Sequence, residues 1–135
     1  MLVVHHLNDS RSQRVLWLLE ELGVSYELKR YQRDPQTRLA PPELQAVHPL
    51  GKSPVITDGV NTIAESGPGV DYVLRKHGNG ALRPAAHSAE FERYAEWLHY
   101  SEGSARLPLM LNLYVGRLAE AGKPLLPRID SELAN

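Results

Sequence analysis

The sequence Gly51-Lys-Ser-Pro-Val-Ile-Thr-Asp-Gly-Val-Asn-Thr-Ile-Ala-Glu-Ser66 decides the fold of this chain. Asp58-Gly59 separates two β-forming runs, residues 54–57 and 60–64, and this dipeptide is the strongest short hairpin signal in the sequence. Because proline has no N–H to give to a sheet, Pro54 indicates the start of a strand or a sheet edge. The stretch therefore predicts a β-hairpin that begins at a proline and leads into a helix.

Upstream of this hairpin, the sequence has the pattern of a βαβ unit. Residues 2–6 favour a first strand, apolar residues recur at helical spacing over residues 13–22, and residues 25–31 alternate as a second strand. Gly23 stands where a glycine commonly ends a helix. We therefore expect two parallel strands joined by a right-handed helical crossover.

Two further helices are expected around the hairpin. The first covers residues 43–47 and is ended by Pro49, which cannot continue a helix. The second runs from about residue 68 to residue 77. The order β-α-β, short helix, β-hairpin, helix requires a mixed sheet with helices packed on it. This is the α/β thioredoxin-like arrangement, which we predict for an N-terminal domain over residues 1–80.

Residues 81–135 differ in character, because no β signal follows the linker at residues 78–84. An amphipathic helix is expected to start near Ser88. Pro108 should kink or break that helix, since it removes one helical hydrogen bond and crowds the preceding turn. We expect this part to be a partial, incomplete all-helical C-terminal domain.

Composition excludes several classes of function. The net charge of −1 offers no basic field for nucleic acid or an anionic membrane. No apolar run reaches membrane-spanning length and the first residues lack a signal-peptide pattern, so we expect a cytoplasmic protein. The absence of cysteine excludes disulfides and a cysteine nucleophile. His5 and His6 should face opposite sides of a strand, so we expect no metal site there.

Four motifs occur in order along the N-terminal part of the chain. They are Ser-Arg-Ser-Gln-Arg-Val-Leu-Trp-Leu-Leu-Glu-Glu-Leu (10–22), Ala-Pro-Pro-Glu-Leu (40–44), His-Pro-Leu-Gly-Lys-Ser-Pro-Val (48–55) and Glu-Ser-Gly (65–67). Together they resemble the cytosolic glutathione S-transferases, most closely a bacterial and fungal branch. The resemblance covers residues 1 to about 80. It implies a detoxification enzyme that conjugates the glutathione thiolate to a small electrophile, with glutathione as cosubstrate, no resident cofactor, and a homodimeric assembly.

The resemblance also implies which residues hold glutathione. The bond before Pro54 is cis in this family, and we expect the turn to leave the N–H and C=O of Val55 free for the cysteinyl unit, as in strand addition. A helix N-terminus favours anions, so Ser66 can hold the γ-glutamyl carboxylate while Glu65 takes the adjacent ammonium. Lys52 can reach the glycyl carboxylate. The simpler interpretations are a strand-starting proline, an N-cap serine and a solvated lysine.

Catalysis requires a group that stabilises the thiolate, because a thiol with a pKa of ~8.5 is mostly protonated at neutral pH. A hydroxyl beside a helix N-terminus can supply that stabilisation. We assign this role to Ser10, in the loop between the first strand and the first helix. Ser12 is the alternative, although an N-cap role is favoured there. Asp9 in the same loop would repel a thiolate.

The second part of the chain departs from the family pattern, because it stops soon after its first long helix. The tail over residues 124–135 has few apolar residues and two prolines, so we expect it not to replace the missing helices. Trp97, Tyr100 and Met110 either line a pocket for the electrophile or form plain core. The competing function is a non-catalytic glutathione-binding or regulatory interaction module of the same fold.

Overall fold

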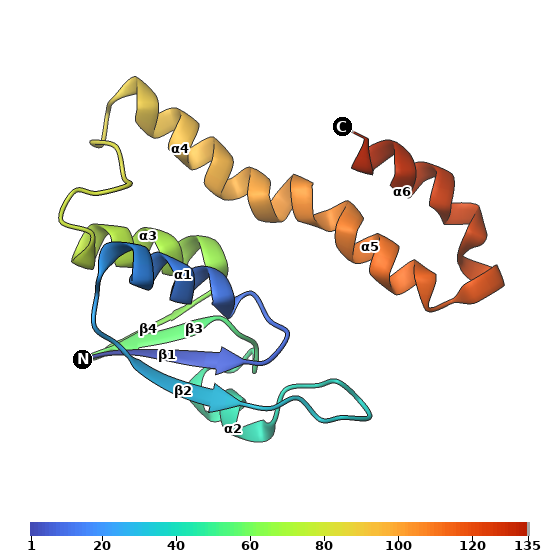
Figure 1. Ribbon diagram of the computed structural model, residues 1–135, viewed down its shortest axis with the longest axis horizontal. Coiled ribbons are helices and arrows are strands. Elements are labelled where there is room, and N and C mark those ends of the chain that lie inside the picture. The colour runs from blue at the N-terminus through green and yellow to red at the C-terminus, as the bar shows by residue number, and fades with distance from the viewer. Residues whose placement is uncertain (135) are drawn as a thin grey trace. The chain divides into compact units, whose positions relative to one another are not determined.

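The computed structural model describes residues 1–134, and they form two compact units that divide between Ala85 and Ala86 (Figure 1). The first unit contains a β-sheet and three helices, and the second is entirely helical. Within the described part of the chain, no helix combines the length and apolar character needed to cross a membrane.

The sheet of the first unit has four strands in the order β2-β1-β3-β4. The strands are β1 (Leu2–Leu7), β2 (Glu27–Tyr31), β3 (Val55–Asp58) and β4 (Asn61–Ala64). β1 pairs in parallel with β2, whereas β1 with β3 and β3 with β4 are antiparallel. The predicted mixed sheet of the thioredoxin-like arrangement is therefore confirmed.

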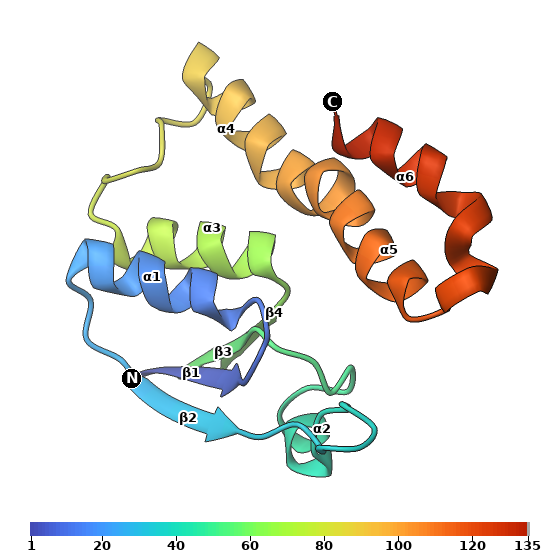
Figure 2. The same ribbon diagram turned by 45° about the vertical axis from the view of Figure 1, so that its right-hand side comes forward.

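Helices cover both faces of this sheet, as Figures 1 and 2 show. The helices are α1 (Ser12–Leu22), α2 (Pro42–Val47) and α3 (Ser66–His77). One core joins α1 and α3 to the sheet face that carries Leu2, Val4 and Ile56. A smaller core joins Leu44 of α2 to the opposite face. Alternate residues of β1 thus belong to different layers, as the two-residue period of a strand requires.

Element bounds differ from the predictions by a few residues. The hairpin loop consists of Gly59 and Val60, because Asp58 is still paired with Asn61. Gly59 has φ +58°, a conformation that glycine adopts without steric cost. α3 begins at Ser66, two residues earlier than expected, and Pro68 fits inside its first turn, where its missing N–H would have no intrahelical partner.

The second unit contains α4 (Ala89–Tyr100), a π-helical turn (Ser101–Ala105), α5 (Arg106–Gly116), a 3₁₀ segment (Ala119–Leu125) and α6 (Leu126–Leu133). Ser88 caps α4 as predicted, since its hydroxyl accepts from the Phe91 N–H at 3.2 Å. Pro108 does not break the helix. The wider π turn lies directly before α5, and Pro108 is the third residue of α5. The ribbon continues from α4 through this turn into α5 (Figures 1 and 2).

The C-terminal tail is more ordered than its composition predicted. It forms α6, which packs on α5 and buries Ile129 to 4% exposure. Pro127 is compatible with this helix because it lies in the first turn. The tail therefore adds one helix. Five leucines of α5 and the turn after it remain 41–58% exposed, namely Leu107, Leu109, Leu111, Leu113 and Leu118.

Candidate functional site

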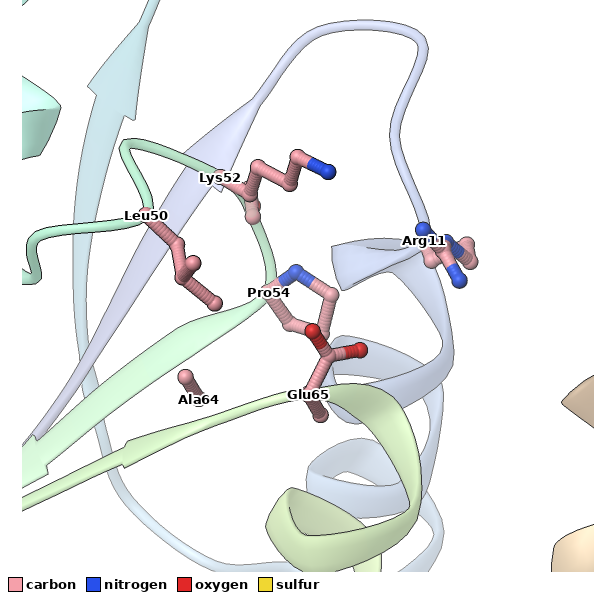
Figure 3. Close-up of a pocket in the computed structure, with 7 residues that line it drawn as sticks. Arg11, Leu50, Lys52, Pro54, Ala64 and Glu65 are labelled. Atoms are coloured by element: carbon pink, nitrogen blue, oxygen red, sulfur yellow. The ribbon is translucent and has the colours of Figure 1, made fainter.

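A small pocket lies where β3 begins and β4 ends. The antiparallel pairing of Val55 with Ala64 brings these two strand ends together. The pocket is lined by Arg11, Leu50, Lys52, Ser53, Pro54, Ala64 and Glu65 (Figure 3). The two motifs that were eleven residues apart in sequence, at the proline and at the start of α3, therefore share one site.

The proline turn has the predicted cis peptide bond, but Ser53 rather than Val55 lines the pocket. The Ser53–Pro54 bond is cis, as the resemblance implies. Val55, however, is paired with His5 on one side and Ala64 on the other, and it is only 1% exposed. The prediction that its backbone groups are free is wrong, because β3 is an interior strand. The pocket is instead lined by Ser53, which precedes the strand.

Charged side chains surround Pro54. Lys52 and Glu65 both line the pocket, as predicted, and both are exposed. Arg11 also lines it from the start of α1 (Figure 3). Arg11 was not predicted from the sequence, although it lies inside the first motif, between the two serines considered for catalysis. The site therefore offers cations and an anion within one small surface.

Glu65 has an unusual backbone conformation. It is the N-cap residue of α3 and has φ 74° and ψ 150°. A side chain in this region costs about 1–3 kcal/mol, and such residues cluster at functional sites. The Glu65 side chain makes no capping hydrogen bond to α3, whereas its C=O accepts from the Gly69 N–H at 3.0 Å. Its place beside the pocket makes this strained residue a candidate for a functional role.

Ser66 is buried without a partner. It is the first residue of α3 and is 4% exposed, and among residues 1–134 its Oγ is the one buried side-chain polar atom that has no hydrogen bond. The simpler interpretation as an N-cap fails, because Glu65 occupies that position. An unpaired buried hydroxyl costs about 1–3 kcal/mol. A ligand that reaches the N-terminus of α3 would recover this cost.

The hydroxyls of the β1–α1 loop are linked to the pocket. The Ser10 Oγ lies 2.7 Å from the Ser12 Oγ and 3.3 Å from the Oγ of Ser53, a pocket residue. Ser12 is fully buried, and its Oγ lies 2.8 Å from the Nδ1 of His6. The N-cap of α1 is Arg11, so the N-cap role favoured for Ser12 is wrong.

Asp9 is directed into a different interaction. Its carboxylate accepts from the Arg38 guanidinium and, at 3.2 Å, from the Asn8 amide. The hydrogen bond from Arg38 lowers the pKa of Asp9, so the side chain is an exposed, paired carboxylate. This pairing neutralises the charge that would otherwise oppose a thiolate in the same loop.

The two adjacent histidines face different layers, as the strand period predicted. The Nδ1 of His5 lies 2.9 Å from the Tyr31 hydroxyl, and its Nε2 lies 3.2 Å from the Thr57 Oγ1. Burial lowers the pKa of His5 and favours the neutral ring. His6 instead meets Ser12 of α1. No group of three or more His, Asp or Glu side chains in the described residues is arranged to hold a metal ion.

Trp97 and Tyr100 are not core residues of the second unit. They are 63% and 42% exposed and form an edge-to-face pair with ring centroids 5.5 Å apart. Met110 is half-buried. The plain-core interpretation therefore does not hold for the two aromatic residues.

Fold and site together define a thioredoxin-like domain with a charged pocket at a cis-proline turn. The glutathione S-transferase N-terminal domain profile matches residues 1–75. Glutathione S-transferase 3 of Schizosaccharomyces pombe is 43% identical over 104 residues, which are 77% of this chain and 42% of that protein. Glutathione S-transferase 1 of Saccharomyces cerevisiae is 39% identical over 129 residues, with coverages of 90% and 54%. The chain belongs to the glutathione S-transferase family.

Solved structures agree with this assignment. A glutathione S-transferase of Actinobacillus pleuropneumoniae is 33% identical with a TM-score of 0.78, and the match covers 97% of this chain and 63% of that one. A glutathione transferase of Phanerochaete chrysosporium, solved with oxidized glutathione, shares the fold at 19% identity with a TM-score of 0.80, covering 98% and 62%. This chain spans about half the length of the curated relatives it matches.

Proposed function

We propose that this chain binds glutathione in the pocket beside Pro54 and acts as a glutathione transferase on a small electrophile. The observation that carries the proposal is the unpartnered, buried hydroxyl of Ser66 at the N-terminus of α3, beside the strained Glu65. Solved relatives with bound glutathione support the choice of ligand.

The charged groups of the pocket match the charged groups of glutathione. Ser66 and the first N–H groups of α3 receive the γ-glutamyl carboxylate, because a helix N-terminus favours an anion. Glu65 takes the neighbouring ammonium, and Lys52 pairs with the glycyl carboxylate. The backbone of Ser53, directly before Pro54, faces the cysteinyl unit in place of Val55, whose backbone lies inside the sheet.

The reaction begins once the cysteinyl sulfur lies near the β1–α1 loop. Ser10 donates its O–H to the thiolate and so favours the ionised form; each pKa unit of that shift corresponds to about 1.4 kcal/mol. The thiolate then attacks the electrophilic carbon, forming a C–S bond while the leaving group departs with its bonding electrons. No resident cofactor takes part in this scheme.

A homodimer, a cytoplasmic location and a role in detoxification belong to the same proposal. The exposed leucines on α5 support an assembly, since so many large apolar side chains left open on one helix are typical of a surface that a partner covers. The absence of cysteine is compatible with the dimer, the location and the role alike.

Two measurements on the same protein test the function: a glutathione titration and steady-state conjugation of glutathione to a chloro-dinitrobenzene. We expect saturable binding together with turnover. Ser10→Ala should lower kcat/KM by roughly 10²-fold, the effect of removing one donor to a developing negative charge. Ser25→Ala, at an exposed serine outside the pocket, is the matched control. Binding without turnover would favour the non-catalytic module.

A further inference from the structure

We propose that Ser10, Ser12 and His6 form a proton relay that carries the proton of the glutathione thiol away from the sulfur to the Nδ1 of His6. The inference rests on the proposed function and deepens it. It assigns a role to His6, which neither the motifs nor the pocket identify. We refer to these three residues as the hydroxyl relay.

The alternation of side chains along β1 places His6 on the sheet face that α1 covers. His6 lies on the same sheet face as Leu2 and Val4, which pack against α1. This face meets the first residue of α1, Ser12, whose hydroxyl is fully buried. The Ser12 Oγ therefore lies within hydrogen-bond distance of both other members, 2.8 Å from the His6 Nδ1 and 2.7 Å from the Ser10 Oγ.

The neighbouring hydrogen bonds fix a direction for the protons. Ser53 donates its hydroxyl proton to the C=O of His5 at 2.8 Å, so it acts only as an acceptor toward Ser10. Ser10 has two acceptors within reach, and Ser12 at 2.7 Å is closer than Ser53 at 3.3 Å. In the tautomer that the relay requires, with no proton on Nδ1, the His6 ring accepts the hydrogen bond of Ser12. One lone pair of the Ser10 oxygen accepts the Ser12 N–H, which leaves another for an S–H donor.

Ionisation of the thiol then requires no outside reactant. The S–H bond breaks, its electron pair stays on sulfur, and the proton moves to the Ser10 oxygen. Ser10 passes its own proton to Ser12, and Ser12 passes its proton to the His6 Nδ1. The products are a thiolate and an imidazolium, and every hydrogen bond of the relay has reversed. Ser10 now donates to the thiolate, which is the role the proposed function requires.

The surroundings of His6 are compatible with this charge. Arg30 of β2 pairs with His6 in register, but it is exposed, so water screens its repulsion of an imidazolium. On the other side, Pro54 precedes β3 and Val55 begins it, and both are apolar. α1 contributes the Ser12 hydroxyl. The thiolate formed at the other end of the relay favours the cationic ring, while the N-terminus of α1 favours the thiolate.

Two substitutions interrupt the relay in different ways. His6→Asn retains an amide oxygen that can accept the Ser12 hydrogen bond but cannot hold a proton. Ser12→Ala removes the middle hydroxyl from a site that alanine fits without added volume. Three quantities are measured for each variant and for the double variant: kcat/KM for conjugation, the ultraviolet thiolate absorbance of bound glutathione against pH, and glutathione affinity. His87→Asn, at an exposed histidine outside the relay, is the control.

We expect each single substitution to lower kcat/KM roughly tenfold or more, as loss of positioned proton transfer does. The thiolate absorbance should appear at higher pH in both variants, with glutathione affinity unchanged. The double variant should be no worse than either single one, because members of one relay are not additive. His87→Asn should match the wild type in all three measurements.

Different results would overturn different parts of this scheme. If His6→Asn and Ser12→Ala keep the thiolate titration of the wild type, the relay is wrong although conjugation stands. Losses that multiply in the double variant also overturn it. If the wild type binds glutathione without turnover, the proposed enzyme fails, and the thiolate titration of the complex still decides the relay. Thermal unfolding checks each variant, and if His6→Asn does not fold, the Ser12→Ala titration alone decides whether the relay exists.

Discussion

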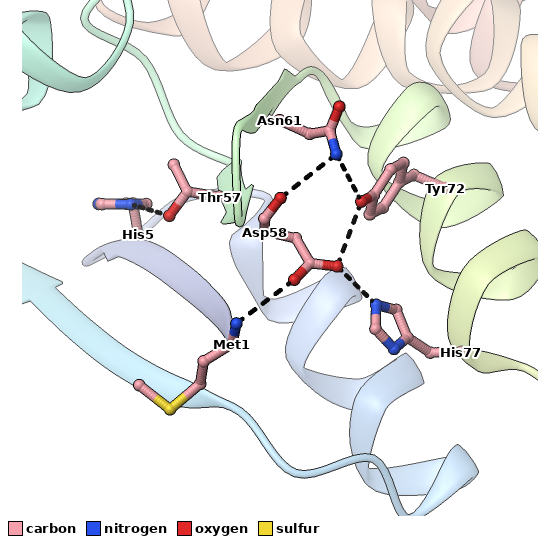
Figure 4. Close-up of polar contacts among 7 residues, drawn as sticks. All are labelled: Met1, His5, Thr57, Asp58, Asn61, Tyr72 and His77. Atoms are coloured by element: carbon pink, nitrogen blue, oxygen red, sulfur yellow. Dashed lines mark hydrogen bonds and ion pairs between the residues drawn. The ribbon is translucent and has the colours of Figure 1, made fainter.

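The two ends of the β3–β4 hairpin differ in how their polar groups are paired. At the pocket end, Glu65 is strained and the Ser66 hydroxyl is buried without a partner. At the other end, Asp58 accepts hydrogen bonds from His77 at 2.9 Å and Tyr72 at 3.2 Å and faces the N-terminal ammonium at 3.7 Å (Figure 4). The pocket end therefore carries a buried hydroxyl without a hydrogen bond, whereas the carboxylate at the other end has three polar partners.

This difference follows from the course of α3. The helix starts at the pocket and runs antiparallel to the hairpin's return strand, so its second half brings Tyr72 and His77 to Asp58. Asn61, beside the hairpin loop, adds a hydrogen bond of 3.3 Å to the Tyr72 hydroxyl. We infer that the Asp58 end holds α3 in place and that this support permits the strain at its other end.

The largest expected effect is on stability and comes from the Asp58 end. Asp58→Ala should lower the free energy of unfolding by about 3 kcal/mol, because it removes the shared acceptor of two partly buried donors and leaves them unpaired. Urea denaturation measures this change, with Asp130→Ala on α6 as an exposed control. Glutathione affinity of the folded variant should be unchanged. A loss of affinity without a loss of stability would reverse the roles of the two ends.

The next effect is on binding and comes from the pocket end. Ser66→Ala should weaken glutathione binding by about 2 kcal/mol, the value of a hydrogen bond to a charged group. Its free energy of unfolding should stay the same or rise, because the substitution removes a buried hydroxyl that has no partner. Calorimetric titration and urea denaturation test both parts. A clear loss of stability would show that Ser66 supports the fold.

The smallest expected effect is the pH dependence of the Asp58 end. The hydrogen bond from His77 lowers the pKa of Asp58 below its ordinary value of 3.8. A carboxyl with a lowered pKa in the folded state stabilises the protein fully above the ordinary value and loses this contribution as the pH falls through the folded-state pKa. Wild type should therefore lose stability in acid more steeply than Asp58→Ala. Equal slopes in urea denaturation between pH 5 and pH 2 (the approximate range over which such a contribution is lost) would contradict the assignment.

Much of the fold could be predicted because its signals are local. The hairpin dipeptide Asp58-Gly59, the helical spacing before Gly23 and the proline turn at Pro54 each act over a few residues. The cis bond and the meeting of Lys52 with Glu65 followed from the family motifs. The antiparallel pairing of the hairpin strands places the start of β3 beside the end of β4, and this brings the two motifs together.

The remaining features depend on long-range placement that local pattern does not encode. A free backbone at Val55 is a wrong prediction because the sequence does not say that β3 is flanked on both sides. The partner of Ser12, His6, becomes visible only once α1 is placed on a particular face of β1, so local pattern favours a cap there. The contact between His77 and Asp58, 19 residues apart, likewise requires the helix to be docked. Arg11 could not be selected from the sequence, because its motif does not show that this side chain reaches the pocket.

Two chemically identical neighbours, His5 and His6, obtain different partners solely from their strand register. A shift of one residue along β1 would turn each side chain to the opposite face of the sheet. β1 is held against such a shift from both sides, by parallel pairing with β2 and antiparallel pairing with β3. An insertion or deletion of a single residue at the start of β1 would therefore have to break two ladders or exchange the two imidazoles. Insertions and deletions should therefore be excluded from β1 even at its two half-buried positions, Val3 and His6.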